Sequence, residues 1–84
     1  MADQSKILVI DDDFDIRDTF RMVLEAQGYL VASAASGAEG REAMTRDPAD
    51  LIILDVMMED ADAGFVTAQW LKEHFKGVPV ILLS

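Results

Sequence analysis

The sequence predicts a doubly wound α/β fold, in which helices cover both faces of a parallel β-sheet. Short β-branched apolar runs without polar alternation recur along the chain, which is typical of strands that are buried on both faces. Segments with apolar residues at three- and four-residue steps, the period of an amphipathic helix, separate these runs. The predicted order of elements is βαβαβαβ, and right-handed crossovers leave few topologies open to it.

The first third of the chain predicts a strand, a helix and a second strand. Residues 6–10 form an apolar run that stops abruptly at Asp11. A helix should follow, with Gly28 as a natural C-terminal stop. Residues 29–34 predict the second strand, although Ala and Ser dilute its apolar character. The apolar positions that predict the helix are Ile16, Phe20, Val23 and Leu24.

The middle of the chain predicts a second helix and a third strand. Ser36 and Glu39 fit the S-x-x-E capping box, so a helix should begin there and run to about Arg46, before an Asp-Pro pair. Residues 51–54 are apolar without alternation and predict a strand that ends on Asp55.

The last part of the chain predicts a third helix, closed near Gly77, and a fourth strand over residues 80–83. Ser84 stands at the C-terminal end of that strand. The apolar positions that predict the helix are Phe65, Ala68, Trp70, Leu71 and Phe75.

The composition excludes several classes of protein. The chain has 84 residues, no cysteine and a formal net charge of −9. Disulfides and thiolate metal sites are therefore excluded, and direct nucleic-acid binding is disfavoured. No segment approaches the roughly 20 apolar residues that span a bilayer, and no secretory leader is recognisable. We expect one cytoplasmic domain over residues 1–84.

Acidic side chains follow two strands that we expect to be neighbours. Asp11 and Asp12 end the first strand, Asp55 ends the third, and Ser84 ends the fourth. Ligands of open parallel sheets bind outside the carboxyl ends of the strands, so these side chains should converge. Two carboxylates about 4 Å apart repel by roughly 4 kcal/mol at an effective dielectric near 20, so three require a cation or a proton. Oxygen ligands alone favour Mg²⁺, which suits phosphoryl transfer.

Three segments together resemble the response-regulator receiver domains of two-component signalling. Residues 6–13 resemble the opening of these domains, residues 51–58 their phosphorylation strand, and residues 78–84 the strand that ends on Ser or Thr. The segments occur in the family's order and at its separations. The resemblance implies a flavodoxin-like doubly wound sheet with strand order 2-1-3-4. It also implies that the family's fifth strand and last two helices are missing from this chain.

The same resemblance implies a role for each site residue. Asp55 would accept a phosphoryl group from a phosphohistidine of a sensor histidine kinase or phosphotransfer protein, and would contribute to the Mg²⁺ site. Asp12 would bind Mg²⁺ directly, Asp11 through a water molecule, and Met57 through its backbone carbonyl. Ser84 would hydrogen-bond a phosphoryl oxygen and bias the domain toward its active conformation. The implied function is signalling rather than metabolic catalysis.

Two departures from the family pattern affect the site. Glu59 and Ala63 replace the Pro and Gly that usually follow the phosphorylated Asp, and Gly64 comes one residue late. We therefore expect one extra residue in this loop. The Lys of the fifth strand is absent, and neither Lys72 nor Lys76 can replace it, because both lie on the third helix or just after it.

A chain that stops after the fourth strand would expose residues 80–83 as an apolar sheet edge. Such edges recruit partners or aggregate. The missing fifth strand and Lys fit either a fragment of a receiver domain or a reduced domain with impaired chemistry, and we expect the fragment. For such a truncated sheet we expect self-association or strand exchange through this edge.

Two other functions stay open. Phosphohydrolases of the haloacid dehalogenase kind also form a phospho-aspartate, and Asp13-Phe14-Asp15 imitates their paired acids, but Arg17 replaces the expected Thr or Val. Asp13 and Asp15 are better assigned to a helix N-cap and first turn. The Glu59 loop and the missing Lys favour instead a receiver-like interaction module that is not phosphorylated. Turnover of a phosphate ester would support the first alternative, and failure to bind millimolar Mg²⁺ the second.

Overall fold

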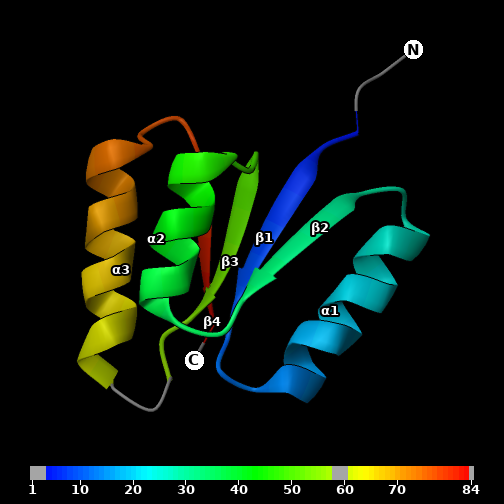
Figure 1. The fold of residues 1–84 in the computed structure, drawn as a ribbon, viewed down its shortest axis with the longest axis horizontal. Helices are drawn as coiled ribbons and strands as arrows, with labels where there is room; N and C mark the ends of the chain where they lie inside the picture. The colour runs from blue at the N-terminus through cyan, green and yellow to red at the C-terminus, as the bar shows by residue number, and fades with distance from the viewer. Residues whose placement is uncertain (1–3, 58–60, 84) are drawn as a thin grey trace.

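The computed structural model describes residues 4–57 and 61–83, which form a parallel four-stranded sheet with three helices (Figure 1). This is the flavodoxin-like architecture predicted from the sequence. No helix in this part of the chain is long and apolar enough to cross a membrane. The elements are β1 (Lys6–Ile10), α1 (Phe14–Ala26), β2 (Leu30–Ala34), α2 (Gly37–Arg46), β3 (Leu51–Asp55), α3 (Ala61–His74) and β4 (Val80–Leu83).

β1 lies inside the sheet, between β2 and β3. The strand order is β2-β1-β3-β4, as predicted, and every neighbouring pair is parallel. Ile10 pairs with Ala34 of β2 on one side and with Leu54 of β3 on the other. The strands therefore end at the same edge of the sheet, where the residue after β1 lies beside the last residue of β3.

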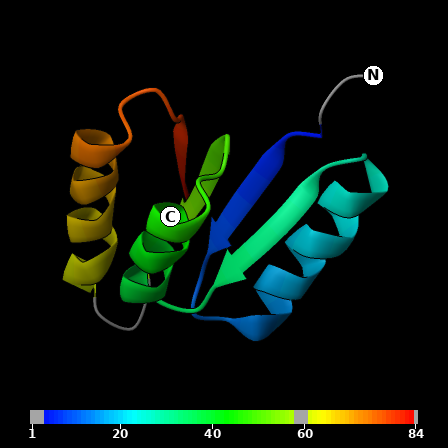
Figure 2. The same ribbon diagram turned by 45° about the horizontal axis from the view of Figure 1, so that its top comes forward.

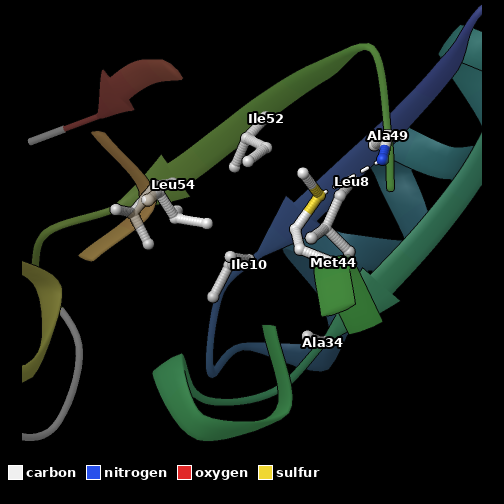
Figure 3. Close-up of a cluster of buried hydrophobic side chains, with 8 residues drawn as sticks. Leu8, Ile10, Ala34, Met44, Ala49, Ile52 and Leu54 are labelled. Carbon is white, nitrogen blue, oxygen red and sulfur yellow. Dashed lines mark hydrogen bonds between the residues drawn. The ribbon is translucent and has the colours of Figure 1, made fainter. Parts of the chain in front are cut away.

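Helices lie on both faces of the sheet, α2 and α3 on one face and α1 on the other (Figures 1 and 2). The face under α2 and α3 carries the larger core. Met44 of α2 lies beside Leu8 in this core, and its sulfur accepts a hydrogen bond from the Ala49 amide at 3.2 Å (Figure 3). The buried residues of this core are Leu8, Ile10, Ala34, Met44, Ala49, Ile52, Leu54 and Leu71.

α1 covers its face of the sheet less completely. Phe20 and Leu24 of α1 pack on a small buried cluster, but no residue of the helix is itself buried. That cluster consists of Ile7, Val9 and Ile53. The apolar side chains of α1 that are between 42% and 66% exposed are Phe14, Ile16, Met22 and Val23.

The helix ends follow the predicted local signals. Ser36 caps α2, and its Oγ accepts a hydrogen bond from the Glu39 amide at 3.1 Å. The Glu39 carboxylate in turn accepts one from the Ala35 amide, which completes a capping arrangement. Asp13 caps α1, as predicted. After α1, Gly28 adopts a φ of 94°, a left-handed conformation that favours glycine.

The third helix ends earlier than predicted. α3 stops at His74, so Phe75, which we expected inside the helix, lies in the segment that leads to β4. The Phe75 carbonyl accepts a hydrogen bond from the Val78 amide at 3.0 Å, and its ring lies 5.8 Å from that of Trp70. The Phe75 amide still donates to the Leu71 carbonyl at 2.8 Å, so Phe75 directly follows the last turn of the helix. β2 likewise begins one residue later than predicted.

β4 is an edge strand within the described residues, because it pairs with β3 alone. Ile81 and Leu82 are 47% and 50% exposed, which agrees with the predicted apolar edge. Self-association through this edge stays a prediction. The expected extra residue beside Glu59 lies outside the part of the chain that the structure describes.

Candidate functional site

Three carboxylates meet at the carboxyl-terminal edge of the sheet. Asp11 follows β1 directly, Asp12 comes next, and Asp55 is the last residue of the neighbouring strand β3. One side-chain oxygen of each residue lies within 4.8 Å of the others. The structure therefore brings together the acids that the sequence predicted to converge.

Asp11 is the buried member of this cluster, with 4% of its surface exposed. Its amide donates to the carbonyl oxygen of Ala34 in β2 at 3.1 Å, and its Oδ1 accepts a hydrogen bond from the Asp13 amide at 2.9 Å. Burial raises the pKa of Asp11, and the carboxylates of Asp55 and Asp12 raise it further, against a lowering by the Asp13 amide. The cluster therefore favours a bound cation or a proton over three uncompensated charges.

Asp55 is half-buried at the end of β3. Its Oδ1 accepts a hydrogen bond from the Met57 amide at 2.8 Å, which orients the carboxylate at the start of the following loop. The Val56 amide donates to the carbonyl oxygen of Leu83 in β4 at 3.0 Å, so β4 supports the same segment. Because Asp55 is partly exposed and Asp12 is exposed, the cluster is open to solvent.

The ligand set of the cluster fits a hard divalent cation. Carboxylate oxygens are the ligands that Mg²⁺ prefers, and the cluster of described residues contains neither thiolate nor imidazole. Neighbouring ligands of an octahedral Mg²⁺ lie about 3 Å apart, and only one pair among three ligands can be opposite, at about 4.2 Å. Oxygens that lie up to 4.8 Å from one another therefore need to move closer together, or to bind through water. The cluster could hold Mg²⁺ with Asp11, Asp12 and Asp55.

The other predicted site residues have different outcomes. Ser84 lies outside the described residues, although Leu83 before it pairs with Asp55 in the β3–β4 ladder. Met57 lies two residues after Asp55, and the role of its carbonyl as a ligand stays a prediction. Lys72 lies in the last turn of α3, at the opposite edge of the sheet from the cluster (Figure 1), which agrees with the expectation that it cannot serve the site.

Two contacts beside the site were not predicted from the sequence. Arg17 Nη1 donates to the backbone carbonyl of Asp11 at 2.7 Å. Gly64 of α3 lies so close to Val56 that a Cβ atom on it would be 2.7 Å from the Val56 Cα. An arginine one turn into the helix that follows the acidic strand end was a signal for the first contact. Gly64, one residue later than the glycine usual in the family, was a signal for the close approach to Val56.

The fold and the site define a class of protein, an open parallel α/β domain with an acidic, oxygen-only site at the carboxyl ends of its strands. The family model described as response regulator receiver domain matches residues 7–84. The chain therefore belongs to the response regulator receiver domain family.

Regulators and solved structures show the same relationship. The chain is 38% identical to the transcriptional regulatory protein GltR of Pseudomonas aeruginosa, a match that covers 99% of this chain and 35% of that protein. The N-terminal domain of a response regulator receiver protein from Methanoculleus marisnigri has a TM-score of 0.89 at 38% identity, covering 98% of this chain and 68% of that one. The chemotaxis protein CheY4 of Vibrio cholerae has a TM-score of 0.88 at 29% identity, and the match covers 95% of this chain and 68% of that one. The chain spans between about a sixth and about a third of the length of the curated relatives it matches.

Proposed function

We propose that this chain is a phosphoacceptor of two-component signalling and that Asp55 takes the phosphoryl group. Response regulator receiver domains interact with histidine kinases or phosphotransfer proteins, so a phosphohistidine of such a protein is the proposed donor. The observation that carries the proposal is the position of Asp55, partly exposed at the end of β3 and within 4.8 Å of the Asp11 and Asp12 oxygens. A cytoplasmic location is part of the proposal.

The proposed reaction moves a phosphoryl group from a nitrogen to an oxygen. A carboxylate oxygen of Asp55 forms a bond to phosphorus as the bond from phosphorus to the imidazole nitrogen breaks, and the electron pair stays with the imidazole. The Met57 amide, 2.8 Å from Asp55 Oδ1, orients the attacking group. Asp11 and Asp12 would hold Mg²⁺ together with Asp55 and the Met57 carbonyl. Mg²⁺, when bound, offsets the charge on the phosphoryl oxygens.

The phosphoryl group is proposed to act as a signal by adding charge beside β4. It brings about 1.5 to 2 negative charges and three hydrogen-bond acceptors. In the proposal, the hydroxyl of Ser84 donates to one of its oxygens. The Val56 amide donates a hydrogen bond to the Leu83 carbonyl, so a movement of Ser84 would also shift the backbone at the ends of β3 and β4. The output is then a conformational change that a partner reads, rather than turnover of a metabolite.

Phosphorylation is tested by incubating the chain with Mg²⁺ and a small acyl phosphate and measuring its intact mass. The parent should gain one phosphoryl group, and Asp55→Asn should gain none. Asp18→Asn, on α1 outside the cluster, is the matched control and should react like the parent. A gain that persists in Asp55→Asn would refute the assignment of Asp55. A parent that binds Mg²⁺ but is not modified would favour the non-phosphorylated interaction module, and continuous phosphate release from an ester the phosphohydrolase.

Self-association through the β4 edge is the second part of the proposal. β4 exposes Ile81 and Leu82 along a strand that no other described strand covers. Sedimentation at rising concentration should show a growing mass. Ile81→Lys should reduce it, because charges on an edge strand oppose pairing with another strand. A monomeric mass at every concentration would rule this association out.

A further inference from the structure

The peptide bond between Asp11 and Asp12 links the two aspartates that follow β1. Before it, the Asp11 amide donates to the carbonyl oxygen of Ala34 at 3.1 Å. After it, the Asp13 amide donates to Asp11 Oδ1 at 2.9 Å. Because a peptide unit is planar, its rotation about the two flanking bonds changes where the Asp12 side chain points. The orientation of this plane therefore affects where the Asp12 carboxylate lies relative to its neighbours.

Arg17 reaches this peptide from α1. Its Nη1 donates to the Asp11 carbonyl oxygen at 2.7 Å in a partly buried setting. A hydrogen bond from a charged guanidinium is stronger than one between neutral groups. The Arg17 amide also donates to the Asp13 carbonyl at 3.1 Å, and the guanidinium lies 5.7 Å from the centre of the Phe14 ring. Both the backbone and the side chain of Arg17 are thus tied to the turn that carries the aspartates.

We infer that Arg17 is a positioning residue, which fixes the plane of the Asp11–Asp12 peptide so that both carboxylates converge with Asp55. This role rests on the proposed Mg²⁺-dependent function and adds to it a residue outside the carboxylate cluster. Arg17 acts through the backbone of Asp11 and does not need to contact the phosphoryl group.

The competing explanation is that Arg17 only offsets the negative charge of the cluster. A fixed cation near three carboxylates repels a bound cation, so removing it would tighten Mg²⁺ binding. Positioning predicts the opposite, because the carboxylates would lose their convergence. The sign of the change in Mg²⁺ affinity therefore separates the two explanations.

Arg17→Met removes the guanidinium and keeps a long apolar side chain. We expect this variant to bind Mg²⁺ about 10-fold more weakly or worse, as when outer partners of metal ligands are removed. Isothermal titration calorimetry measures the affinity. Arg17→Lys keeps the charge and a donor but lacks the planar fork, so its affinity should lie between those of Arg17→Met and the parent.

Arg21→Met is the matched control, since it removes the same charge one turn further along α1. Arg21 pairs with Asp18 and Glu25 instead of the strand end. Its loss should change the Mg²⁺ affinity by less than about twofold, as expected for an exposed pair.

Urea unfolding without Mg²⁺ reports separately whether each variant is folded. Unchanged or tighter Mg²⁺ binding by folded Arg17→Met would overturn the inference. If Arg17→Met does not fold, Arg17→Lys decides, because an affinity equal to that of the parent would overturn the inference as well. Failure of the parent itself to bind Mg²⁺ would instead overturn the proposed function and the positioning role with it, so the two failures are distinguishable.

Discussion

Asp11, Asp12 and Asp55 concentrate negative charge at one partly buried point of the molecule. Asp11 is 4% exposed, so water screens its charge poorly. Repulsion within the cluster should therefore destabilise the folded chain as long as no cation is bound. If Mg²⁺ binds only the folded state, its binding would raise the free energy of unfolding and offset this destabilisation.

Replacing Asp11 by Asn should raise the free energy of unfolding without Mg²⁺ by about 1–3 kcal/mol, because one of the like charges is removed. The Asn side chain keeps an oxygen for the Asp13 amide. The same change should diminish the stabilisation that Mg²⁺ provides. Urea unfolding with and without Mg²⁺ measures both effects, and Asp18→Asn, outside the cluster, should change each by no more than about 0.5 kcal/mol. A less stable Asp11→Asn variant in Mg²⁺-free buffer would contradict this account of the site.

The convergence of the acids was predictable, whereas the contact that holds them was not. Asp11 and Asp55 follow strands that are parallel neighbours, and parallel strands end together. The hydrogen bond from Arg17 to the Asp11 carbonyl depends on the angle between α1 and the sheet. An arginine one turn into α1 was a signal for this contact, but the angle itself results from tertiary packing, which local sequence patterns do not encode.

Lys6 connects the beginning of β1 with the segment between α2 and β3. Its Nζ donates to the Asp47 carboxylate at 2.7 Å, and its amide donates to the Asp50 carboxylate at 2.8 Å. The Lys6 ammonium lowers the pKa of Asp47 through its hydrogen bond and its charge, with a smaller contribution from Arg46. A carboxyl group whose pKa is lowered on folding stabilises the folded chain while it is ionised.

The stabilisation by Lys6 and Asp47 should be complete at neutral pH and be lost as the pH falls below about 4, through the lowered pKa of Asp47. Lys6→Met removes the partner. Its urea midpoint should therefore lie below that of the parent near pH 7, by a small amount because Asp47 is exposed, and approach it near pH 3. A difference between the two midpoints that stays constant over this range would contradict the assignment.

Among the elements, α3 approaches the end of β3 through a glycine. A Cβ atom on Gly64 would lie 2.7 Å from the Cα and 3.1 Å from the carbonyl oxygen of Val56. These are backbone atoms, which cannot turn aside as the end of a side chain can. Val56 lies between Asp55 and Met57, whose amide orients the Asp55 carboxylate. A side chain on Gly64 would therefore displace the backbone that positions the Asp55 carboxylate.

Gly64→Ala should lower the free energy of unfolding by about 1–3 kcal/mol, as expected for overpacking. It should also slow the gain of mass from an acyl phosphate. Gly77→Ala is the matched control, since nothing lies within 4 Å of its Cβ position. That variant should be neutral or stabilised by up to about 1 kcal/mol through the unfolded state. Equal urea midpoints for the two variants would show that α3 can move away from β3 without cost.

The ends of the elements were predictable where a local signal determines them. Ser36 and Glu39 cap α2 through bonds within a few residues, and Gly28 supplies the left-handed conformation after α1. The end of α3 was not predictable in this way. Trp70 and Phe75 both pack on the core, although Phe75 lies just after the last residue of α3, and apolar periodicity does not distinguish these two positions.

As a whole, the described molecule has two unequal faces. The face under α2 and α3 contains the larger buried cluster, whereas α1 has no buried residue on the other face. Burial of apolar surface contributes about 25 cal/mol per Å². Most of the hydrophobic stabilisation should therefore come from the α2–α3 face.

Two methionines on opposite faces test this inequality with the same chemical change. Met44 of α2 is fully buried, and Met22 of α1 is 59% exposed. Met44→Ala should lower the free energy of unfolding by about 2–5 kcal/mol, and Met22→Ala by less than about 1 kcal/mol. Urea unfolding measures both, and similar losses would show that the two faces contribute equally.

The place of β1 inside the sheet has a consequence for the chain as it is synthesised. β1 is made first, yet each of its two partners arrives only after at least one further helix. Pairings between distant segments form slowly, and the chain emerges N-terminus first. Asp55 comes with the third strand, so a nascent chain carries Asp11 and Asp12 without their partner. We therefore expect the proposed phosphoryl acceptance to be confined to chains in which β3 has already joined β1.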